Sequence, residues 1–231
     1  MLIMQPGDKK DKMLTHTEYL EHLATRNTLP SDHIDYLKQL KTSGFEPKVI
    51  YDIGASILHW EKHAKTIWPD AKIILFDAYQ PTEFLYKNNT YHIGVLSDKD
   101  DEVVKFYTND RYPGGNSYYR EIGSYGNMFP KDAYTLYRTE RLDTVVEEND
   151  FPLPDLVKID TQGAEKDIIK GGIKTFAHAQ HLIVEMQSVE YNEGAPQVDE
   201  TLPYIESLGW KCTAPLFCNN GPDGDYGFTR P

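Results

Sequence analysis

Residues 48–78 read KVIYDIGASILHWEKHAKTIWPDAKIILFDA, and this stretch decides the fold. An apolar run at 49–53 breaks at Gly54, a segment of helical length follows, and a second apolar run at 73–76 ends on Asp77. The pattern predicts a strand, a tight turn, a helix and a parallel strand. Gly54 lets the turn approach a ligand closely, and Asp77 is placed to accept hydrogen bonds from ribose hydroxyls. We expect an adenosine-containing cofactor here, although a plain turn and a strand-end acid would have the same sequence.

Apolar runs alternate with helical periodicities through the rest of the chain. Further strands are predicted at 91–96, 103–107, 155–160, 181–186, 210–217 and 225–230. The order is typical of an α/β fold with a mostly parallel sheet, in which one antiparallel strand lies near the C-terminus. With 231 residues and 39% hydrophobic content, we expect a single domain over 1–231. Its parts are an N-terminal helical extension at 1–46 and an α/β core at 47–231.

Two helices are predicted in the N-terminal extension. Thr15 and Glu18 have the spacing of a capping box, which begins the first helix. Ser31 is the expected N-cap of the second helix, which ends at Gly44. These helices either cover the cofactor or only pack on the sheet.

The composition excludes several classes of partner. A net charge of −12 opposes binding to nucleic-acid phosphates, so we expect no nucleic-acid partner. No apolar run approaches the roughly 18 residues that span a bilayer, and the apolar start is too short for a secretory signal. We therefore expect a soluble, cytoplasmic protein whose oligomeric state stays open. Cys212 and Cys218 are expected to remain reduced.

Residues 107–137 differ in composition from the rest of the chain. Seven of the sixteen tyrosines lie there, together with Gly114 and Gly115. Tyrosine offers a flat apolar face and a hydroxyl, so an insertion of this kind is typical of a substrate lid. A surface loop with tyrosines packed under it would give the same composition. In the lid interpretation Asn116, Tyr118 and Tyr119 contact the acceptor, since they follow the glycine turn.

Four segments together resemble a known family: VIYDIGAS at 49–56, RLDTVVEE at 141–148, PDLVKIDTQGAEKDIIKGG at 154–172 and HLIVEM at 181–186. They are similar to the FkbM-type S-adenosylmethionine-dependent methyltransferases over roughly residues 47–190. The resemblance implies the seven-stranded, Rossmann-like methyltransferase sheet. It also implies O-methylation of a hydroxyl on a sugar, glycan or glycosylated small molecule.

The resemblance assigns cofactor residues as well. Asp52, Gly54, Ala55 and Ser56 would form the first cofactor loop, and Asp77 would hold the ribose. The predicted cofactor set is completed by two strand-end residues, Ala78 and Leu96.

This sequence departs from the family pattern within that set. Ser56 replaces the family asparagine, Leu58 replaces the second glycine, and Asp77 replaces a glutamate. Serine can still cap the following helix, and aspartate can still bind a diol. His59 and Trp60 would enclose the methionine end of the cofactor, or both would only pack.

Methyl transfer from a sulfonium requires an aligned acceptor oxygen and removal of its proton. Asp160 ends a strand at the edge where ligands bind, so it is the first candidate for the base or orienting group. Glu165 and Glu185 are the next catalytic candidates; otherwise Glu165 favours a helix N-terminus and Glu185 is a solvated strand end. Asp160, Glu185 and Gln187 also offer oxygen ligands for Mg²⁺.

Two other function classes stay open. A nicotinamide-dependent oxidoreductase would use the same strand–turn–helix unit, but the turn lacks G-x-G-x-x-G. A non-catalytic module that only binds an adenosine cofactor would fit the changes at Ser56 and Leu58.

Overall fold

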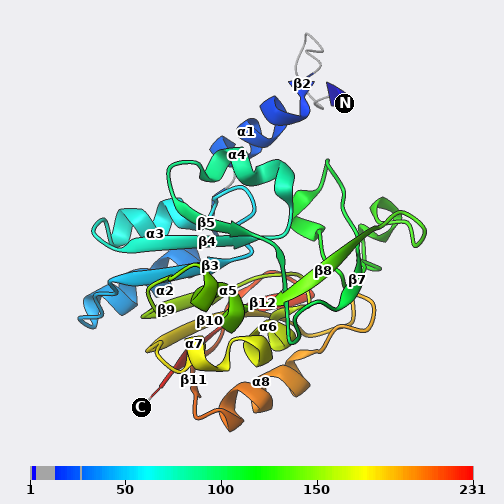
Figure 1. Ribbon diagram of the computed structural model, residues 1–231. Helices are drawn as coiled ribbons and strands as arrows, with labels where there is room; N and C mark the ends of the chain where they lie inside the picture. The colour runs from blue at the N-terminus through cyan, green and yellow to red at the C-terminus, as the bar shows by residue number, and fades with distance from the viewer. Residues whose placement is uncertain (1, 4–13, 27, 231) are drawn as a thin grey trace.

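The computed structural model describes residues 2–3, 14–26 and 28–230. A seven-stranded sheet in the order β11-β12-β10-β9-β3-β4-β5 forms the centre (Figure 1). Its strands are β3 (Val49–Ile53), β4 (Lys72–Asp77), β5 (Thr90–Ile93), β9 (Leu156–Ile159), β10 (His181–Gln187), β11 (Lys211–Asn219) and β12 (Asp223–Thr229). Strand β12 is antiparallel to both of its neighbours, while the pairs from β5 through β10 are parallel. The predicted fold class is confirmed.

The strand order reverses between β3 and β9. The chain runs from β3 to β4 and β5 in one direction and later continues from β9 to β10 in the other. In open α/β sheets such a switch point opens a crevice at the carboxyl ends of the strands. Gly54 and Asp160, the residues that follow β3 and β9, therefore lie side by side, and the Asp160 backbone N donates to the Ile53 carbonyl at 3.0 Å.

The turn after β3 is longer than the sequence suggested. Gly54, Ser56 and Leu58 have positive φ angles of 83°, 45° and 64°. A left-handed backbone cannot continue into a right-handed helix, so α3 begins only at Glu61 (Glu61–Ile67). The expectation that Ser56 caps this helix is therefore wrong.

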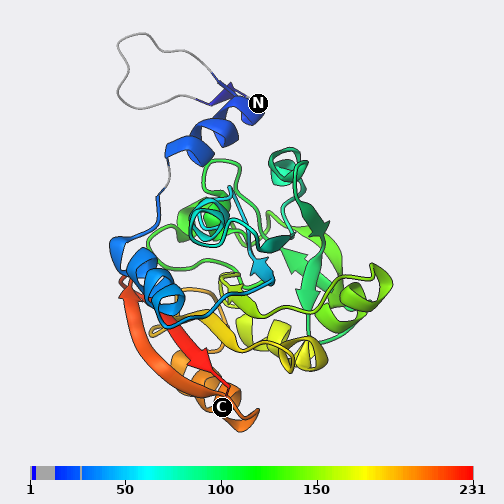
Figure 2. The same cartoon turned by 90° about the vertical axis from the view of Figure 1, so that its left-hand side faces the viewer.

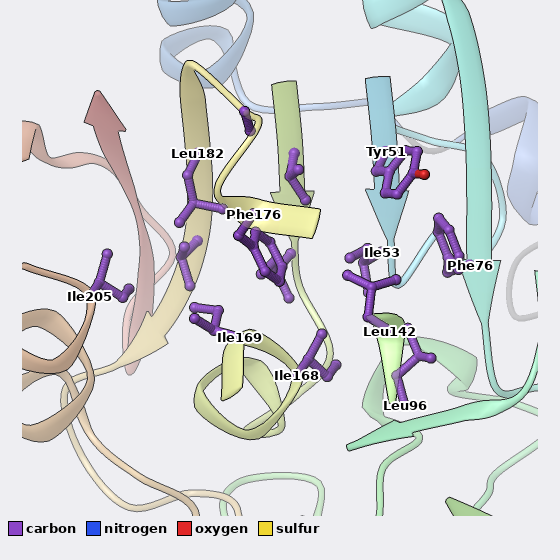
Figure 3. Packing of buried hydrophobic residues seen from close by; sticks show 14 of the residues in the cluster. Tyr51, Ile53, Phe76, Leu96, Leu142, Ile168, Ile169, Phe176, Leu182 and Ile205 are labelled. Carbon is purple, nitrogen blue, oxygen red and sulfur yellow. The ribbon is translucent and has the colours of Figure 1, made fainter. Parts of the chain in front are cut away.

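Helices cover both faces of the sheet, and each strand sends alternate side chains to the two sides. One face packs against α2 (Ser31–Thr42) and α3. The other packs against α5 (Leu142–Glu148), α6 (Glu165–Gly171), α7 (Ile173–Phe176) and α8 (Val198–Ser207). Figure 3 shows Tyr51 and Ile53 of β3 in this second layer, with Leu142, Ile168 and Phe176 from the helices.

The N-terminal extension is described from Leu14 onward, apart from β1 (Leu2–Ile3), which pairs with β2 (Leu14–Thr15). Helix α1 (His16–Arg26) begins with the predicted capping box, since Thr15 N donates to Glu18 Oε2 at 2.8 Å and Glu18 N to Thr15 Oγ1 at 3.2 Å. Helix α2 has Pro30 at its N-cap and no side-chain cap, so the assignment of Ser31 as N-cap is wrong by one residue. Figures 1 and 2 both show α1 at the opposite end of the molecule from β11.

A smaller sheet carries the aromatic insertion. Its order is β6-β8-β7, with β6 (Val95–Ser97), β7 (Val103–Phe106) and β8 (Thr135–Arg141). The strand predicted to end near Leu96 is divided at Gly94, so that β5 joins the main sheet and β6 joins the small one. The insertion connects β7 to β8 and holds two short 3₁₀ turns, η2 (Pro113–Gly115) and η3 (Gly126–Met128). Before β5 the chain forms η1 (Gln80–Thr82) and α4 (Glu83–Tyr86).

Within the described part of the chain, no helix combines the length and the apolar character that crossing a bilayer requires. No disulfide joins Cys212 and Cys218.

The contact between β3 and β9 explains why residue 54 is a glycine. A β-carbon on Gly54 would lie 1.8 Å from the backbone oxygen of Asp160. We had expected Gly54 to make room for a ligand, but the neighbouring strand end already excludes a side chain there.

We predict that Gly54→Ala lowers the free energy of unfolding by about 3 kcal/mol or more, because it combines backbone strain with overpacking. For a chain of this size that is a fall in Tm of about 6–12 °C by calorimetry. Gly44→Ala is the matched control: Gly44 has φ 93° but open space around its β-carbon. The control should cost about 1 kcal/mol. Equal losses in the two variants would contradict this account of Gly54.

Candidate functional site

A cavity of about 470 Å³ opens at the carboxyl ends of β3, β4, β9 and β10. Most of the predicted site residues line it: Gly54, Ser56, Asp77, Ala78, Leu96, Asn116, Tyr118, Asp160 and Glu185. Its other walls come from α1, through Tyr19 and Leu23, and from residues 111–118 of the insertion. The predicted residues Asp52, Ala55, Tyr119 and Glu165 are not among those that line the cavity.

Asp77 ends β4 with its carboxylate at the cavity wall. One oxygen accepts a hydrogen bond from Ser56 N at 2.6 Å, and the other accepts one from Tyr79 N at 2.8 Å. Burial raises its pKa, against the lowering effect of these backbone donors. The two bonds fix the carboxylate between the turn after β3 and the segment after β4.

A buried lysine occupies the middle of the switch point. Lys158 of β9 is 2% exposed, and its Nζ lies 3.2 Å from Asp160 Oδ2 and 3.5 Å from Asp52 Oδ1. It also donates to the Gly54 carbonyl at 3.4 Å. Asp52 is completely buried, so its role is to pair with Lys158 under the cavity rather than to touch a cofactor. Burial raises the pKa of Asp52 even against this positive charge.

Asp160 and Glu185 share one wall of the cavity, and their pKa values are shifted in opposite directions. Burial by itself raises the pKa of Asp160, but the Lys158 charge and hydrogen bonds from Glu185 and Lys158 prevail and hold it well below its usual value. Burial and the nearby Asp160 charge raise the pKa of Glu185 well above its usual value. Asp160 is therefore the carboxylate of the pair and Glu185 the protonated carboxyl. Gln162 joins them, donating to Asp160 Oδ1 at 3.2 Å and to Glu185 Oε2 at 3.0 Å.

Glu165 does not face the cavity, which corrects its assignment as a catalytic candidate. Its Oε1 accepts hydrogen bonds from Thr161 N at 2.8 Å, Thr161 Oγ1 at 3.0 Å and Gly163 N at 3.1 Å. Burial raises its pKa to about 7 in spite of these donors. Glu165 thus shapes the turn that presents Asp160 and Gln162.

The predicted acceptor residues divide into two groups. Tyr118 lines the cavity, with its hydroxyl 3.4 Å from both Ser97 Oγ and Asp167 Oδ2. Asn116 also lines it, and its Oδ1 accepts from Asn109 N at 2.7 Å. Tyr119 does not line the cavity, and its hydroxyl donates to the same Asp167 oxygen at 2.7 Å. The insertion therefore both lines the cavity and packs tyrosines beneath itself.

The residues proposed for Mg²⁺ do not converge. Gln187 donates to the carbonyls of Ala195 and Pro196 at 2.9 and 3.3 Å and accepts from Tyr191 N and Asn192 N. Its amide is thus fully used by the loop after β10, and the metal hypothesis is not supported.

Another group of ligand-type side chains lies elsewhere among the described residues: His33, Cys218 and Asp225. His33 Nδ1 lies 3.1 Å from Asp225 Oδ2, and His33 Nε2 accepts from Trp60 Nε1 at 2.7 Å. If His33 bound a metal through Nδ1, its neutral imidazole would carry the proton on Nε2. That nitrogen instead accepts the hydrogen bond from Trp60, so it carries no proton. Hydrogen bonding therefore accounts for this cluster without a metal.

His59 and Trp60 also have different roles. Trp60 is completely buried away from the cavity, where it packs and donates to His33, whereas His59 lines the cavity. Burial, with the Lys158 charge second, lowers the pKa of His59 to about 4, so the imidazole is neutral at physiological pH.

Several residues of the site were not predicted from the sequence. Lys158 was detectable, since a lysine inside the apolar strand LVKI needs a buried partner. Gln162 and Tyr19 had no such signal, because their positions depend on how a turn and a separate helix meet the sheet.

Comparisons with known proteins agree with this geometry. The family model described as "Methyltransferase FkbM domain" matches residues 53–212. A putative O-methyltransferase from Klebsiella pneumoniae has a similar structure, with a TM-score of 0.51 and 11% identity, covering 98% of this chain and 92% of that one. The O-methyltransferase TomG from Streptomyces achromogenes, involved in tomaymycin synthesis and solved with SAM, has a TM-score of 0.51 and 10% identity, covering 95% and 92%. At these identities the two structures show a shared fold. No curated protein matches the chain in sequence.

We predict that Lys158→Met lowers the free energy of unfolding at pH 7 by about 3–5 kcal/mol, because it leaves a buried carboxylate without its cation. In the wild type, the contribution of ionised Asp160 is present above about pH 4 and is lost only as pH falls through its depressed pKa. In the variant, burial raises the pKa of Asp160, so the folded state takes up a proton as the pH falls. The destabilisation caused by Lys158→Met should therefore be smaller at pH 5 than at pH 7.

Urea unfolding at the two pH values measures this difference. The control is Lys38→Met, which removes an exposed pair with Asp35 and should change stability by no more than about 0.5 kcal/mol. A loss for Lys158→Met as small as that of the control would contradict the role given to the buried lysine.

Proposed function

The chain belongs to the FkbM methyltransferase family, and from this premise we propose that it is an S-adenosylmethionine-dependent O-methyltransferase acting on a hydroxyl of a sugar, glycan or glycosylated small molecule. We further infer that residues 1–231 form one methyltransferase domain, since α2 packs on the sheet and α1 lines the cavity. A cytoplasmic location stays a prediction.

The residues around the switch point fit an adenosine cofactor. Asp77 presents its carboxylate to the cavity at the end of β4, where a ribose diol is held in folds of this type. Gly54, Ser56, His59 and Ala78 line the cavity as well. Leu58 keeps φ 64°, a conformation that glycine adopts without strain. Replacing a family glycine with Leu58 therefore leaves the left-handed turn in place.

S-adenosylmethionine supplies a methyl group that its sulfonium activates, so the protein must chiefly orient the acceptor. Asp160 is the ionised member of the carboxyl pair on the cavity wall and can accept the hydrogen bond of an incoming hydroxyl. Because its pKa is depressed, it is a weak base, and we assign it the role of aligning the oxygen and receiving the proton as the new bond forms. Gln162 and protonated Glu185 hold Asp160 in position.

The wall formed by the insertion is the observation that favours a carbohydrate acceptor. Tyr112 and Tyr118 present aromatic rings there, Asn116 adds an amide, and Arg111 is the one permanent cation among the described residues that line the cavity. Sugars stack their C–H faces on aromatic rings and use neutral hydrogen-bond partners. A polyphosphate or nucleic acid would need several cations.

Mass spectrometry of the protein incubated with S-adenosylmethionine and a panel of nucleotide-sugars and glycans tests this function. We expect a methyl group on a carbohydrate hydroxyl. Methylation of a protein or nucleic-acid nitrogen would contradict the proposed acceptor, and retained cofactor without transfer to any sugar would favour the non-catalytic module.

We predict that Asp77→Ala weakens the binding of S-adenosylmethionine about 10- to 150-fold, as expected for lost hydrogen bonds to a charged acceptor. Titration calorimetry measures the change. Asp70→Ala is the control, because Asp70 is an exposed acid just before the other end of the same strand. Tight binding of NADH with no binding of S-adenosylmethionine would overturn the cofactor assignment.

Asp160→Asn should reduce turnover at least about a hundredfold and leave cofactor affinity within a few-fold, because it removes the charge that orients the hydroxyl. Glu165→Gln is the matched control, since its amide oxygen can still accept from Thr161 and Gly163. Steady-state kinetics on the methylated sugar should show near-normal turnover for the control. If both variants lose turnover equally, Asp160 has a structural role only.

A further inference from the structure

Three segments that are far apart in the sequence meet at Tyr79. Its backbone N donates to Asp77 Oδ1 at 2.8 Å, and its hydroxyl donates to Asp110 Oδ1 at 2.5 Å. The same hydroxyl lies 3.3 Å from His16 Nε2 at the start of α1. One residue, through its backbone N and its hydroxyl, thus connects Asp77, the aromatic insertion and the N-terminal helix.

A second contact closes this arrangement into a ring. Tyr19 of α1 donates from its hydroxyl to the carbonyl of Arg111, the residue after Asp110, at 2.8 Å. Tyr19 and Arg111 both line the cavity, whereas Tyr79 lies behind it and is 6% exposed. The ring therefore holds α1 and the start of the insertion, two walls of the cavity, against the end of β4. Tyr79 itself does not line the cavity.

The proton positions in the ring follow from the chemistry of the groups. Burial and the hydrogen bond to Asp110 raise the pKa of Tyr79, so its phenol keeps its one proton. That proton goes to the Asp110 carboxylate, which can only accept. His16 Nε2 must then donate to the Tyr79 oxygen. Loss of the Tyr79 hydroxyl would therefore remove the contacts with Asp110 and His16 at once, while the backbone bond from Tyr79 to Asp77 would remain.

We propose that Tyr79 is a positioning residue: cofactor bound at Asp77 restrains Tyr79, and Tyr79 in turn fixes α1 and residues 109–113 as walls of the acceptor site. A ligand that holds the Asp77 carboxylate in one orientation also restricts the backbone that donates to it. The ring of hydrogen bonds transmits that restraint to the helix and the insertion. This inference rests on the proposed function for the identity of the cofactor, but its test needs no acceptor.

Hydrogen exchange with and without S-adenosylhomocysteine tests the proposal. In the wild type, S-adenosylhomocysteine should slow amide exchange in residues 17–26 and 109–113. In Tyr79→Phe, calorimetry should give an affinity within about threefold of wild type, since the backbone bond to Asp77 stays, whereas the added protection of both segments should fall at least about tenfold. Direct contact of α1 with the ligand would protect the helix without the Tyr79 hydroxyl, so this result separates the two explanations.

Two further variants complete the design. Tyr91→Phe is the matched control, because it also removes a tyrosine bond to a carboxylate, that of Glu83 at 2.9 Å, outside the ring. It should keep the full protection. Tyr19→Phe breaks only the contact between α1 and Arg111, so it should reduce protection of 17–26 and spare 109–113. The proposal is overturned if the wild type gains no protection, if Tyr79→Phe keeps it, or if Tyr79→Phe loses S-adenosylhomocysteine binding. Failure of the proposed function would instead appear as absent binding in the wild type.

Discussion

The ammonium group of Lys158 lies between two strand ends, and the arrangement of the site depends on it. It contacts Asp52 of β3, Asp160 after β9 and the Gly54 carbonyl, all within 3.5 Å. A buried cation with a single partner would be costly, but this one has two carboxylates and a carbonyl to offset its desolvation. It sits where the strand order reverses, which is also where Gly54 leaves room for the Asp160 backbone. The same few atoms therefore join the two halves of the sheet and form the floor of the cavity.

The charge of Lys158 also determines which of Asp160 and Glu185 holds a proton. A hydrogen bond from Glu185 lowers the pKa of Asp160, while the Asp160 charge raises the pKa of Glu185. Lys158 adjoins Asp160, so Asp160 ionises and Glu185 keeps the proton. Pairs of carboxyl groups whose environments push their pKa values apart commonly take distinct roles in catalysis. Here the result is a negative charge on Asp160 at the cavity wall, where we propose that the acceptor hydroxyl is held.

The spacing of apolar residues along the sequence was sufficient to predict the fold class. The runs at 49–53 and 181–186 alternate with helical segments, so the mostly parallel sheet and the closing hairpin could be predicted, and the capping box at Thr15 marked the start of a helix. Strand ends also place residues well, which is why Asp77, Asp160 and Glu185 line the cavity. Side-chain direction past a strand end is different. Glu165 turns toward backbone N–H groups of the turn before α6, Gln187 toward the loop after β10, and Tyr119 toward the Asp167 carboxylate, so none of the three lines the cavity. Helix α1 reaches the cavity through a contact with a residue about ninety positions away.

Carbon-13 NMR of protein labelled at aspartate carboxyl groups measures the charge on Asp160 directly, with the missing signal in Asp160→Asn giving the assignment. We expect a carboxylate that stays ionised from pH 8 down to below about pH 4, the ordinary range for aspartate, because Lys158 holds its pKa low. A carboxyl at position 160 that takes up its proton near neutral pH would contradict the account, because the cavity would then lack the fixed negative charge on which the proposed chemistry depends.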